Sequence, residues 1–332
     1  MTWMVTGGAG YIGSHVVHAF LDAGIDVVVV DDLSSGHPEF VPAQVPFAKG
    51  TVLDEALLTA TLREHACEGV VHLAGFKYAG VSVQRPLHTY AENVSGTLAL
   101  LRAMAEADVA NIVFSSSAAV YGTPDVDLVT EDTPTAPESP YGESKLVCEW
   151  MIRDQARATA TGPVPLRHTS LRYFNVVGSG PEHLYDSSPH NLFPLVLDAL
   201  VAGRTPKVFG TDYPTPDGSC VRDYVHVADL AATHVAAARA LAAGRDLAPV
   251  YNLGSGTGSS VLEIMTAMAD GTGIAFSPEI APRRPGDPAR IVASGDLAAA
   301  DLGWTMTRDL TDMVASAWHA RQVAEGLLRP ER

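Results

Sequence analysis

Short β-branched apolar runs alternate with longer amphipathic stretches through the first half of the chain. The apolar runs are residues 4–5, 27–30, 70–73 and 111–114. Runs this short and this uniformly apolar are typical of strands buried in a parallel sheet. The stretches of helical length are residues 13–23, 55–64, 87–107 and 141–161. Because right-handed crossovers connect parallel strands, the alternation predicts an α/β fold with a doubly wound parallel sheet.

Proline and glycine become more frequent after a further strand candidate at residues 166–173. Loop-rich segments occupy residues 178–189, 210–218 and 278–288. Between them lie helix candidates at residues 192–201, 227–243, 261–269 and 307–326, and a strand candidate at 250–253. This texture predicts a smaller mixed α/β lobe. We therefore expect a first domain at residues 1–175 and the smaller lobe at 176–332, with some segments of the lobe returning to the first sheet.

Composition and charge narrow the classes of function. The 332 residues include 22 Lys and Arg against 38 Asp and Glu, a net charge of −16, and 47% of them are hydrophobic. Such an acidic, well-cored chain lacks the basic surface that nucleic-acid binding requires, so we expect no nucleic-acid partner. No apolar run approaches the roughly 18 residues of a membrane-spanning helix. The first lysine or arginine is Lys49, so the opening segment lacks the basic start that a signal peptide has, and we expect no export.

The cysteines and histidines form no metal or disulfide pattern. Cys67, Cys148 and Cys220 lie far apart without a C-x-x-C pair, which is typical of proteins in a reducing compartment. His15 and His18 share a helix face, but no third ligand accompanies them at a fixed spacing. We therefore expect a cytoplasmic protein with no membrane partner and no metal.

A glycine-rich turn follows the first strand candidate and opens the first helix candidate. Gly8, Gly10 and Gly13 satisfy G-x-G-x-x-G there, and such a turn lets backbone amides approach a pyrophosphate at the positive end of a helix. Asp31 ends the second strand candidate, at the spacing where a carboxylate binds a ribose 2′-hydroxyl and repels a 2′-phosphate. The pattern favours a Rossmann-type NAD site. The alternative is a glycine turn that only closes a β-α unit, with a solvated aspartate.

Three further side chains belong to one edge of the predicted sheet and have the chemistry to move a proton. Tyr141 and Lys145 lie one turn apart at the start of a helix candidate, and Ser117 follows a strand candidate. A nearby ammonium favours the phenolate form of a tyrosine, which can then remove a hydroxyl proton. A serine hydroxyl at a strand end can bridge the substrate and the tyrosine. The alternative for Tyr141 and Lys145 is an amphipathic surface pair.

Six motifs together resemble the extended short-chain dehydrogenase/reductase family of nucleotide-sugar enzymes. They are residues 7–13, 115–122, 141–145, 209–218, 221–227 and 283–287. The last three are long, and they resemble the branch of the family that inverts C4 of UDP-hexoses. The likeness runs over residues 2–318.

The resemblance implies an isomerase of galactose metabolism that interconverts UDP-galactose and UDP-glucose. Tyr141 would take the proton of the sugar 4-hydroxyl while hydride passes from C4 to NAD, and Ser117 would hydrogen-bond the reacting oxygen. Lys145 would tune Tyr141 and bind the nicotinamide ribose. The 4-keto sugar would then rotate and take the hydride back on its other face, so that NAD is regenerated.

The resemblance also assigns binding roles to residues along the whole chain. The implied NAD contacts are Gly7, Gly10, Tyr11, Ile12, Gly13, Asp31, Asp32, Thr51, Val52, Ala74, Lys77, Tyr141, Lys145 and Tyr173. The implied contacts to the UDP-hexose are Asn93, Ser117, Asn175, Asn191, Arg222, Arg284 and Asp287. The two arginines suit phosphate oxygens, which an otherwise acidic protein must bind with local positive charge. A homodimer formed by the helices at residues 87–107 and 141–161 is expected by family analogy.

The chain departs from the family pattern at two positions. Thr51 stands where the family usually carries an aspartate that binds the adenine amino group, which predicts looser retention of NAD. Ile291 stands where side-chain bulk limits the C2 substituent of the sugar, so acceptance of N-acetylated UDP-hexoses stays open.

Three rival functions use the same fold. A 4,6-dehydratase or a UDP-glucuronate decarboxylase needs an acidic residue after the strand-end serine, where this chain has Ala118 and Ala119. A non-catalytic NAD-sensing regulator is allowed by the fold alone. Such a regulator has no use for Ser117, Tyr141 and Lys145 together.

Overall fold

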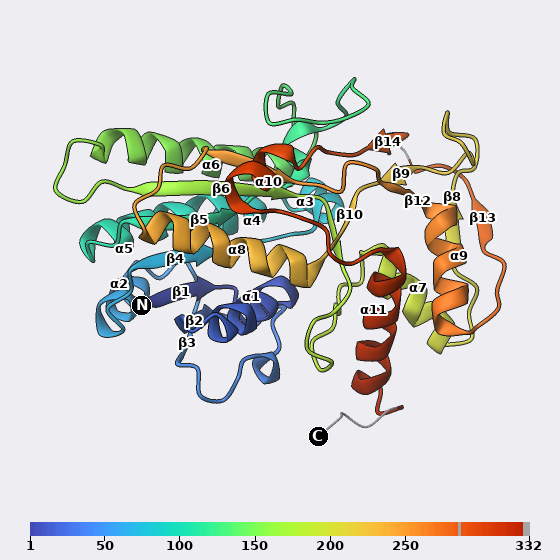
Figure 1. The fold of residues 1–332 in the computed structure, drawn as a ribbon, viewed down its shortest axis with the longest axis horizontal. Helices are drawn as coiled ribbons and strands as arrows, with labels where there is room; N and C mark the ends of the chain where they lie inside the picture. The colour runs from blue at the N-terminus through green and yellow to red at the C-terminus, as the bar shows by residue number, and fades with distance from the viewer. Residues whose placement is uncertain (285–286, 328–332) are drawn as a thin grey trace.

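A seven-stranded parallel sheet forms the centre of the protein in the computed structural model, which describes residues 1–284 and 287–327. The strand order is β11-β6-β5-β4-β1-β2-β3 (Figure 1). The strands are β1 Thr2–Thr6, β2 Asp26–Asp31, β3 Phe47–Lys49, β4 Gly69–His72, β5 Asn111–Ser115, β6 Arg167–Tyr173 and β11 Val250–Leu253. The order runs outward from β1 in both directions, so the doubly wound fold predicted from the sequence is confirmed. No run of apolar residues predicted β3, because this three-residue edge strand has only one half-buried position.

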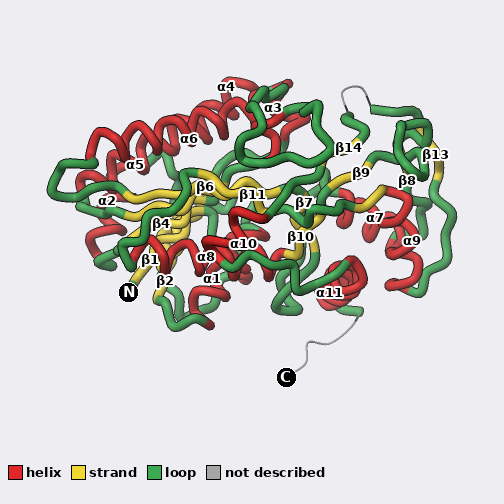
Figure 2. The backbone as a smooth tube through the Cα atoms, turned by 45° about the horizontal axis from the view of Figure 1, so that its top comes forward, coloured by secondary structure: helices red, strands yellow, loops and turns green. Residues whose placement is uncertain are grey.

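Helices cover both faces of this sheet (Figure 2). One face carries α1 Tyr11–Asp22, α8 Val227–Ala242 and α10 Asp296–Leu302, and the other carries α2 Glu55–Glu64, α5 Gly96–Glu106 and α6 Pro140–Thr159. In β2, Val27 and Val29 pack into the core on the α1 side, whereas Val28 and Val30 pack into the core on the α2 side. Successive side chains of a strand point to opposite faces. Both faces are therefore apolar, which explains the unbroken valine run.

The second half of the chain completes the large sheet and also forms a separate smaller core. Its elements β11, α8 and α10 complete the large sheet and one of its faces. A separate core lies among α7 Leu192–Val201, α9 Val261–Thr272 and α11 Leu310–Ala324. Short strands pair as β7 Asn175–Val177 with β10 Tyr224–His226, β9 Val221–Arg222 with β12 Ser259–Ser260 and β14 Arg290–Ile291, and β8 Lys207–Phe209 with β13 Glu279–Ala281. A domain boundary near residue 175 stays a prediction.

The helix predicted at residues 87–107 is present as a continuous helical stretch over residues 86–106, but a π-helical turn interrupts its α-helical repeat. The structure has α3 Ala79–Gln84, α4 Pro86–Tyr90, a π-helical turn η2 Ala91–Ser95, and then α5. Within η2 the Asn93 side chain leaves the helix surface and bonds the backbone of Phe76. A π turn adds a residue to the helical repeat and often marks a functional region.

The described residues contain no membrane-spanning helix and no cluster of metal ligands. No helix among them combines the length and apolarity that crossing a bilayer requires. Nor do His, Cys, Asp or Glu side chains gather there in groups of three or more that could hold a metal ion. Cys67, Cys148 and Cys220 are buried free thiols.

Candidate active site

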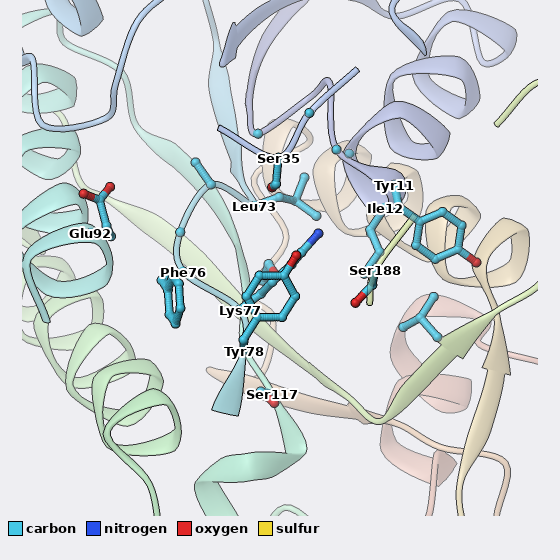
Figure 3. Close-up of a pocket in the computed structure, with 18 of the residues that line it drawn as sticks. Tyr11, Ile12, Ser35, Leu73, Phe76, Lys77, Tyr78, Glu92, Ser117 and Ser188 are labelled. Carbon is cyan, nitrogen blue, oxygen red and sulfur yellow. The ribbon is translucent and has the colours of Figure 1, made fainter. Parts of the chain in front are cut away.

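A cavity of about 540 Å³ opens at the carboxyl edge of the sheet. Its walls include residues that directly follow strands: Gly7 after β1, Asp32 after β2, Ala74 beyond β4, Ser117 beyond β5 and Phe174 after β6. Ligands of open parallel sheets bind outside this edge, because the connecting loops diverge there. In Figure 3 the lining residues Lys77 and Tyr78 lie in the middle of the view, with Phe76 and Glu92 on one side and Tyr11, Ile12 and Ser188 on the other.

The glycine turn is shaped to hold a pyrophosphate. Gly7 has φ +74°, a left-handed conformation that favours glycine. A Cβ on Gly13 would lie 2.0 Å from the Gly7 carbonyl oxygen, so only glycine lets α1 begin this close to the turn. Gly10, the residue before α1, has no side chain to satisfy the first amides of that helix. These free amides lie at the positive helix end and line the cavity, so the residues present fit a dinucleotide.

Asp31 and Lys77 are two charged residues of the cavity lining next to the glycine turn. The carboxylate of Asp31 accepts hydrogen bonds from the amides of Ala9 at 3.0 Å and Leu33 at 2.8 Å. Burial raises the pKa of Asp31, and these amide bonds lower it again in part. Burial lowers the pKa of Lys77, and the carboxylates of Asp186 and Asp31 oppose that effect. The pair of Asp31 and Lys77 thus offers one acceptor and one cation to a nucleotide.

The structure brings Ser117, Tyr141 and Lys145 to one wall of the cavity. Tyr141 lies in the first turn of α6, which Ser139 caps by accepting a hydrogen bond from the Gly142 amide at 3.2 Å. Lys145 follows one turn later, and its Nζ donates to the Ser115 carbonyl at 2.8 Å. Ser117 caps the 3-10 turn η3 Ala118–Tyr121 through the Ala119 amide. Helix and strand ends thus place all three groups on rigid backbone.

Burial controls the proton affinity of this group. Burial raises the pKa of the Tyr141 phenol, and a hydrogen bond with Ser117 lowers it in part. Burial lowers the pKa of Lys145 to about 8, while Cys148 and Glu149 oppose the shift. The phenolate that proton removal needs is therefore disfavoured at rest, and a bound cation beside the phenol would favour it. The arrangement fits a base that becomes active when a positively charged cofactor ring is present.

All fourteen residues that the sequence predicts as NAD contacts line the cavity. The group comprises Gly7, Gly10, Tyr11, Ile12, Gly13, Asp31, Asp32, Thr51, Val52, Ala74, Lys77, Tyr141, Lys145 and Tyr173. The hydroxyl of Tyr173 hydrogen-bonds that of Ser115. Ser115 itself was missed, although it follows the same strand-end logic as Ser117. Phe76, Glu92, Asp186 and Ser188 were also missed, and they come from a loop or a π turn that left no sequence pattern.

The predicted sugar contacts divide into three groups. Asn175 and Asn191 line the cavity with Ser117, and their amides donate to the Asp223 carbonyl at 2.9 Å and to Asp186 Oδ2 at 2.7 Å. Asn93 lies beneath the wall instead. It is 3% exposed, and its side chain bonds the Phe76 backbone and the Ser144 hydroxyl. It supports the loop under the cavity.

Arg222, Arg284 and Asp287 form a second cluster outside the cavity lining. Arg222 Nη2 lies 3.6 Å from Asp287 Oδ1, and the Arg284 guanidinium lies 3.9 Å from the centre of the Phe209 ring. Tyr224, two residues beyond Arg222, lines the cavity. The cluster therefore adjoins the cavity through β9 and β10. Residues 285–286 of the 283–287 motif lie outside the described part of the chain.

The sheet, the glycine turn and the buried lysine beside a tyrosine define a dinucleotide-binding enzyme of Rossmann type. The profile of the NAD dependent epimerase/dehydratase family matches residues 3–254. The chain belongs to that family. It is 44% identical over 313 residues to a UDP-glucose 4-epimerase of Azospirillum brasilense, covering 93% of this chain and 88% of that protein.

Solved structures give the same result for the whole chain. A crystal structure of a UDP-glucose 4-epimerase superposes with a TM-score of 0.92 at 41% identity, covering 97% of this chain and 98% of the other. The enzyme of Bifidobacterium longum, solved with NAD+ and UDP, superposes with a TM-score of 0.88 at 39% identity, covering 98% and 99%. The similarity therefore includes both lobes.

Proposed function

We propose that the protein is an NAD-dependent isomerase that interconverts UDP-galactose and UDP-glucose by inverting C4 of the hexose. The observation that carries this proposal is the placement of Ser117, Tyr141 and Lys145 on the wall of the cavity that the glycine turn opens. The named activity of relatives that share 41–44% of their residues with the chain supports it. The family resemblance noted in the sequence agrees with it.

The residues of the chain would perform the proton transfers. When bound, NAD supplies a reversible acceptor for the hydride of C4. Tyr141 takes the proton of the 4-hydroxyl, and Ser117 holds the reacting oxygen in line with the phenol. Lys145, fixed by the Ser115 carbonyl, stabilises the phenolate. Inversion then needs the 4-keto hexose to turn over, so that C4 would recover the hydride on its opposite face while Tyr141 returns the proton to the C4 oxygen.

Because the 4-keto hexose must rotate within the site, most of the binding energy must come from contacts with the nucleotide and not with the sugar. We propose that Arg222, Arg284 and Asp287 hold the UDP moiety beside the cavity, with Asn175 and Asn191 at the diphosphate and sugar. Guanidinium groups bind phosphate oxygens with strong, charge-assisted hydrogen bonds. The hexose can then exchange faces while the diphosphate stays bound.

The turn after Ser117 favours epimerisation over dehydration. Elimination of water across C5 and C6 needs an acid and a base, and the positions after Ser117 are Ala118 and Ala119 in η3. Their methyl groups cannot transfer protons. A dehydratase or a decarboxylase is therefore not supported by this site.

Thr51 is expected to weaken NAD retention. It lines the cavity, and its Oγ1 accepts a hydrogen bond from the Leu53 amide at 3.3 Å. Asp54, the nearest carboxylate along the chain, accepts from the Leu57 amide at 3.0 Å and caps α2. It is thus engaged in the helix cap and does not replace the aspartate that the family usually has at position 51.

The function is tested with the purified protein and UDP-galactose, followed by proton NMR with and without added NAD. We expect UDP-glucose to appear. Conversion that begins only when NAD is added would still support the epimerase mechanism, and it would show that the protein retains NAD weakly, as expected from Thr51. UDP-N-acetylglucosamine is assayed in parallel, because Ile291 lies half-buried on β14 opposite Arg222. No turnover of either sugar by the NAD-loaded protein would contradict the proposal and favour the regulator.

We also propose a homodimer in the cytoplasm. Leu98 on α5 and Trp150 on α6 are 40% and 45% exposed, and Val83 and Leu87 on the neighbouring α3 and α4 are more exposed still. Pairing these helices between two copies would cover the apolar side chains. Sedimentation is expected to give a dimer for the native protein and a monomer for Trp150→Glu. A native monomer would rule this interface out.

The cytoplasmic location is tested by cell fractionation. The three buried free thiols favour a reducing compartment.

A further inference from the structure

A buried ion pair lies behind the catalytic helix and has no role in the mechanism described so far. Glu149 lies on α6 one turn beyond Lys145, and Arg172 lies on β6 beside Tyr173. Arg172 Nε and Nη2 donate to the two carboxylate oxygens of Glu149 at 2.9 and 2.6 Å. The two residues are 8% and 4% exposed. A bidentate pair of this kind fixes the angle between the helix and the strand.

The same carboxylate holds the serine segment of the site. The Ser116 hydroxyl donates to Glu149 Oε1. Ser116 lies between Ser115, whose carbonyl accepts the hydrogen bond from Lys145 Nζ, and Ser117. Glu149 therefore anchors the segment that contacts both Lys145 and the reacting oxygen.

The other end of the pair reaches the turn that follows Ser117. Arg172 Nη1 lies 2.8 Å from the hydroxyl oxygen of Tyr121, which is the last residue of η3. The Tyr121 hydroxyl in turn donates to Asn252 Oδ1 on β11 at 2.8 Å. Both ends of η3 are thus linked to the ion pair, the first through the serine segment and the second through Tyr121.

The ion pair also sets the charge near Lys145. The titratable groups that act on Lys145 include Tyr141, Cys148 and Glu149 on α6 and His72 on β4. Two residues of β6 adjoin this group: Tyr173 hydrogen-bonds Ser115, and Arg172 pairs with Glu149. Burial lowers the pKa of His72 to about 3 and raises the pKa of Cys148 and of Tyr173. These groups are therefore neutral at pH 7. Glu149, which is paired with Arg172, is the carboxylate that opposes the effect of burial on the pKa of Lys145.

We propose that Glu149 is a positioning residue of this site: its carboxylate fixes residues 115–117 against α6 and keeps the Lys145 ammonium charged beside Tyr141. This inference rests on the proposed epimerase function. Stability alone does not require the pair, because well-packed apolar side chains often replace a buried ion pair without loss. For the same reason, the double variant Glu149→Gln, Arg172→Met is expected to fold even if Glu149→Gln, which leaves Arg172 unpaired, does not.

The test measures the pH dependence of kcat/KM for UDP-galactose and the titration of Lys145 by the NMR shift of its Cε. Losing the Glu149 charge lowers the proton affinity of Lys145, so the ammonium is lost at lower pH. We expect the alkaline limb and the titration midpoint to fall by about one pH unit in Glu149→Gln and by a smaller amount in the double variant, which also removes the Arg172 cation, and kcat to fall about tenfold in both. Ser116→Ala is expected to lower kcat about fivefold without moving the limb.

Asp229→Asn is the matched control. Asp229 is a buried carboxylate on α8 that pairs with Arg308 and bonds Thr307, away from the cavity. We expect this variant to lose thermal stability and to keep the native pH profile and Lys145 titration. Unchanged Lys145 titration in the Glu149 variants, or an equal shift in Asp229→Asn, would overturn the proposal. The titration needs no turnover, so failure of the epimerase assay alone is distinguishable.

Discussion

Tyr141→Phe is expected to reduce kcat for UDP-galactose about 1000-fold, because the change removes the base that takes the 4-hydroxyl proton. The fold should survive. The phenyl ring stays in place, and losing the hydroxyl of a buried tyrosine costs about 1 kcal/mol for each hydrogen bond it made. KM and NAD affinity are expected to stay within about threefold, because the ring remains in place. The measurement is steady-state turnover with NAD saturation confirmed by absorbance.

Tyr90→Phe is the control for that experiment. Tyr90 lies on α4, outside the cavity lining, and its hydroxyl donates to Glu143 on α6. It is thus a tyrosine bonded to the catalytic helix without a place in the site. Its variant should turn over UDP-galactose at a rate within about twofold of the native protein. If Tyr141→Phe retained more than a tenth of native turnover, the assignment of Tyr141 as the base would be wrong.

Sequence patterns predicted the parts of the structure that depend on local rules. The valine run of β2 indicated a strand buried on both faces, because successive side chains of a strand point to opposite sides. Gly13 and Tyr141 could be placed at the cavity because both belong to short motifs next to strand or helix ends. Such motifs stay legible in one sequence, since their spacing is set by a single turn of backbone.

The features that no sequence pattern revealed depend on contacts between distant segments. Asn93 lies in a π turn and supports Phe76 and Ser144 instead of facing the cavity, which no helical period reveals. In the sequence, Glu149 looks like an ordinary polar residue of a surface helix. Its importance comes from Arg172, which is 23 residues away along the chain. Tertiary pairing of this kind has no signature in local spacing.

Gly13→Ala is expected to weaken NAD binding at least about 100-fold, because the glycine turn cannot keep its shape. The new Cβ would lie 2.0 Å from the Gly7 carbonyl oxygen and 2.8 Å from the Gly7 carbonyl carbon. These are backbone atoms, so α1 must move away from the turn, and its free amides move with it. Calorimetric titration with NAD measures the loss.

A second titration, with UDP, shows whether the rest of the molecule is intact. The cluster of Arg222, Arg284 and Asp287 lies outside the cavity lining, so UDP affinity should change less than about threefold in Gly13→Ala. Gly80→Ala is the matched control, because a Cβ at that position in α3 meets no atom within 4 Å. It should bind NAD normally and gain up to about 1 kcal/mol of stability from the higher helix propensity of alanine. Native NAD affinity in Gly13→Ala would show that the pyrophosphate is held elsewhere than at the start of α1.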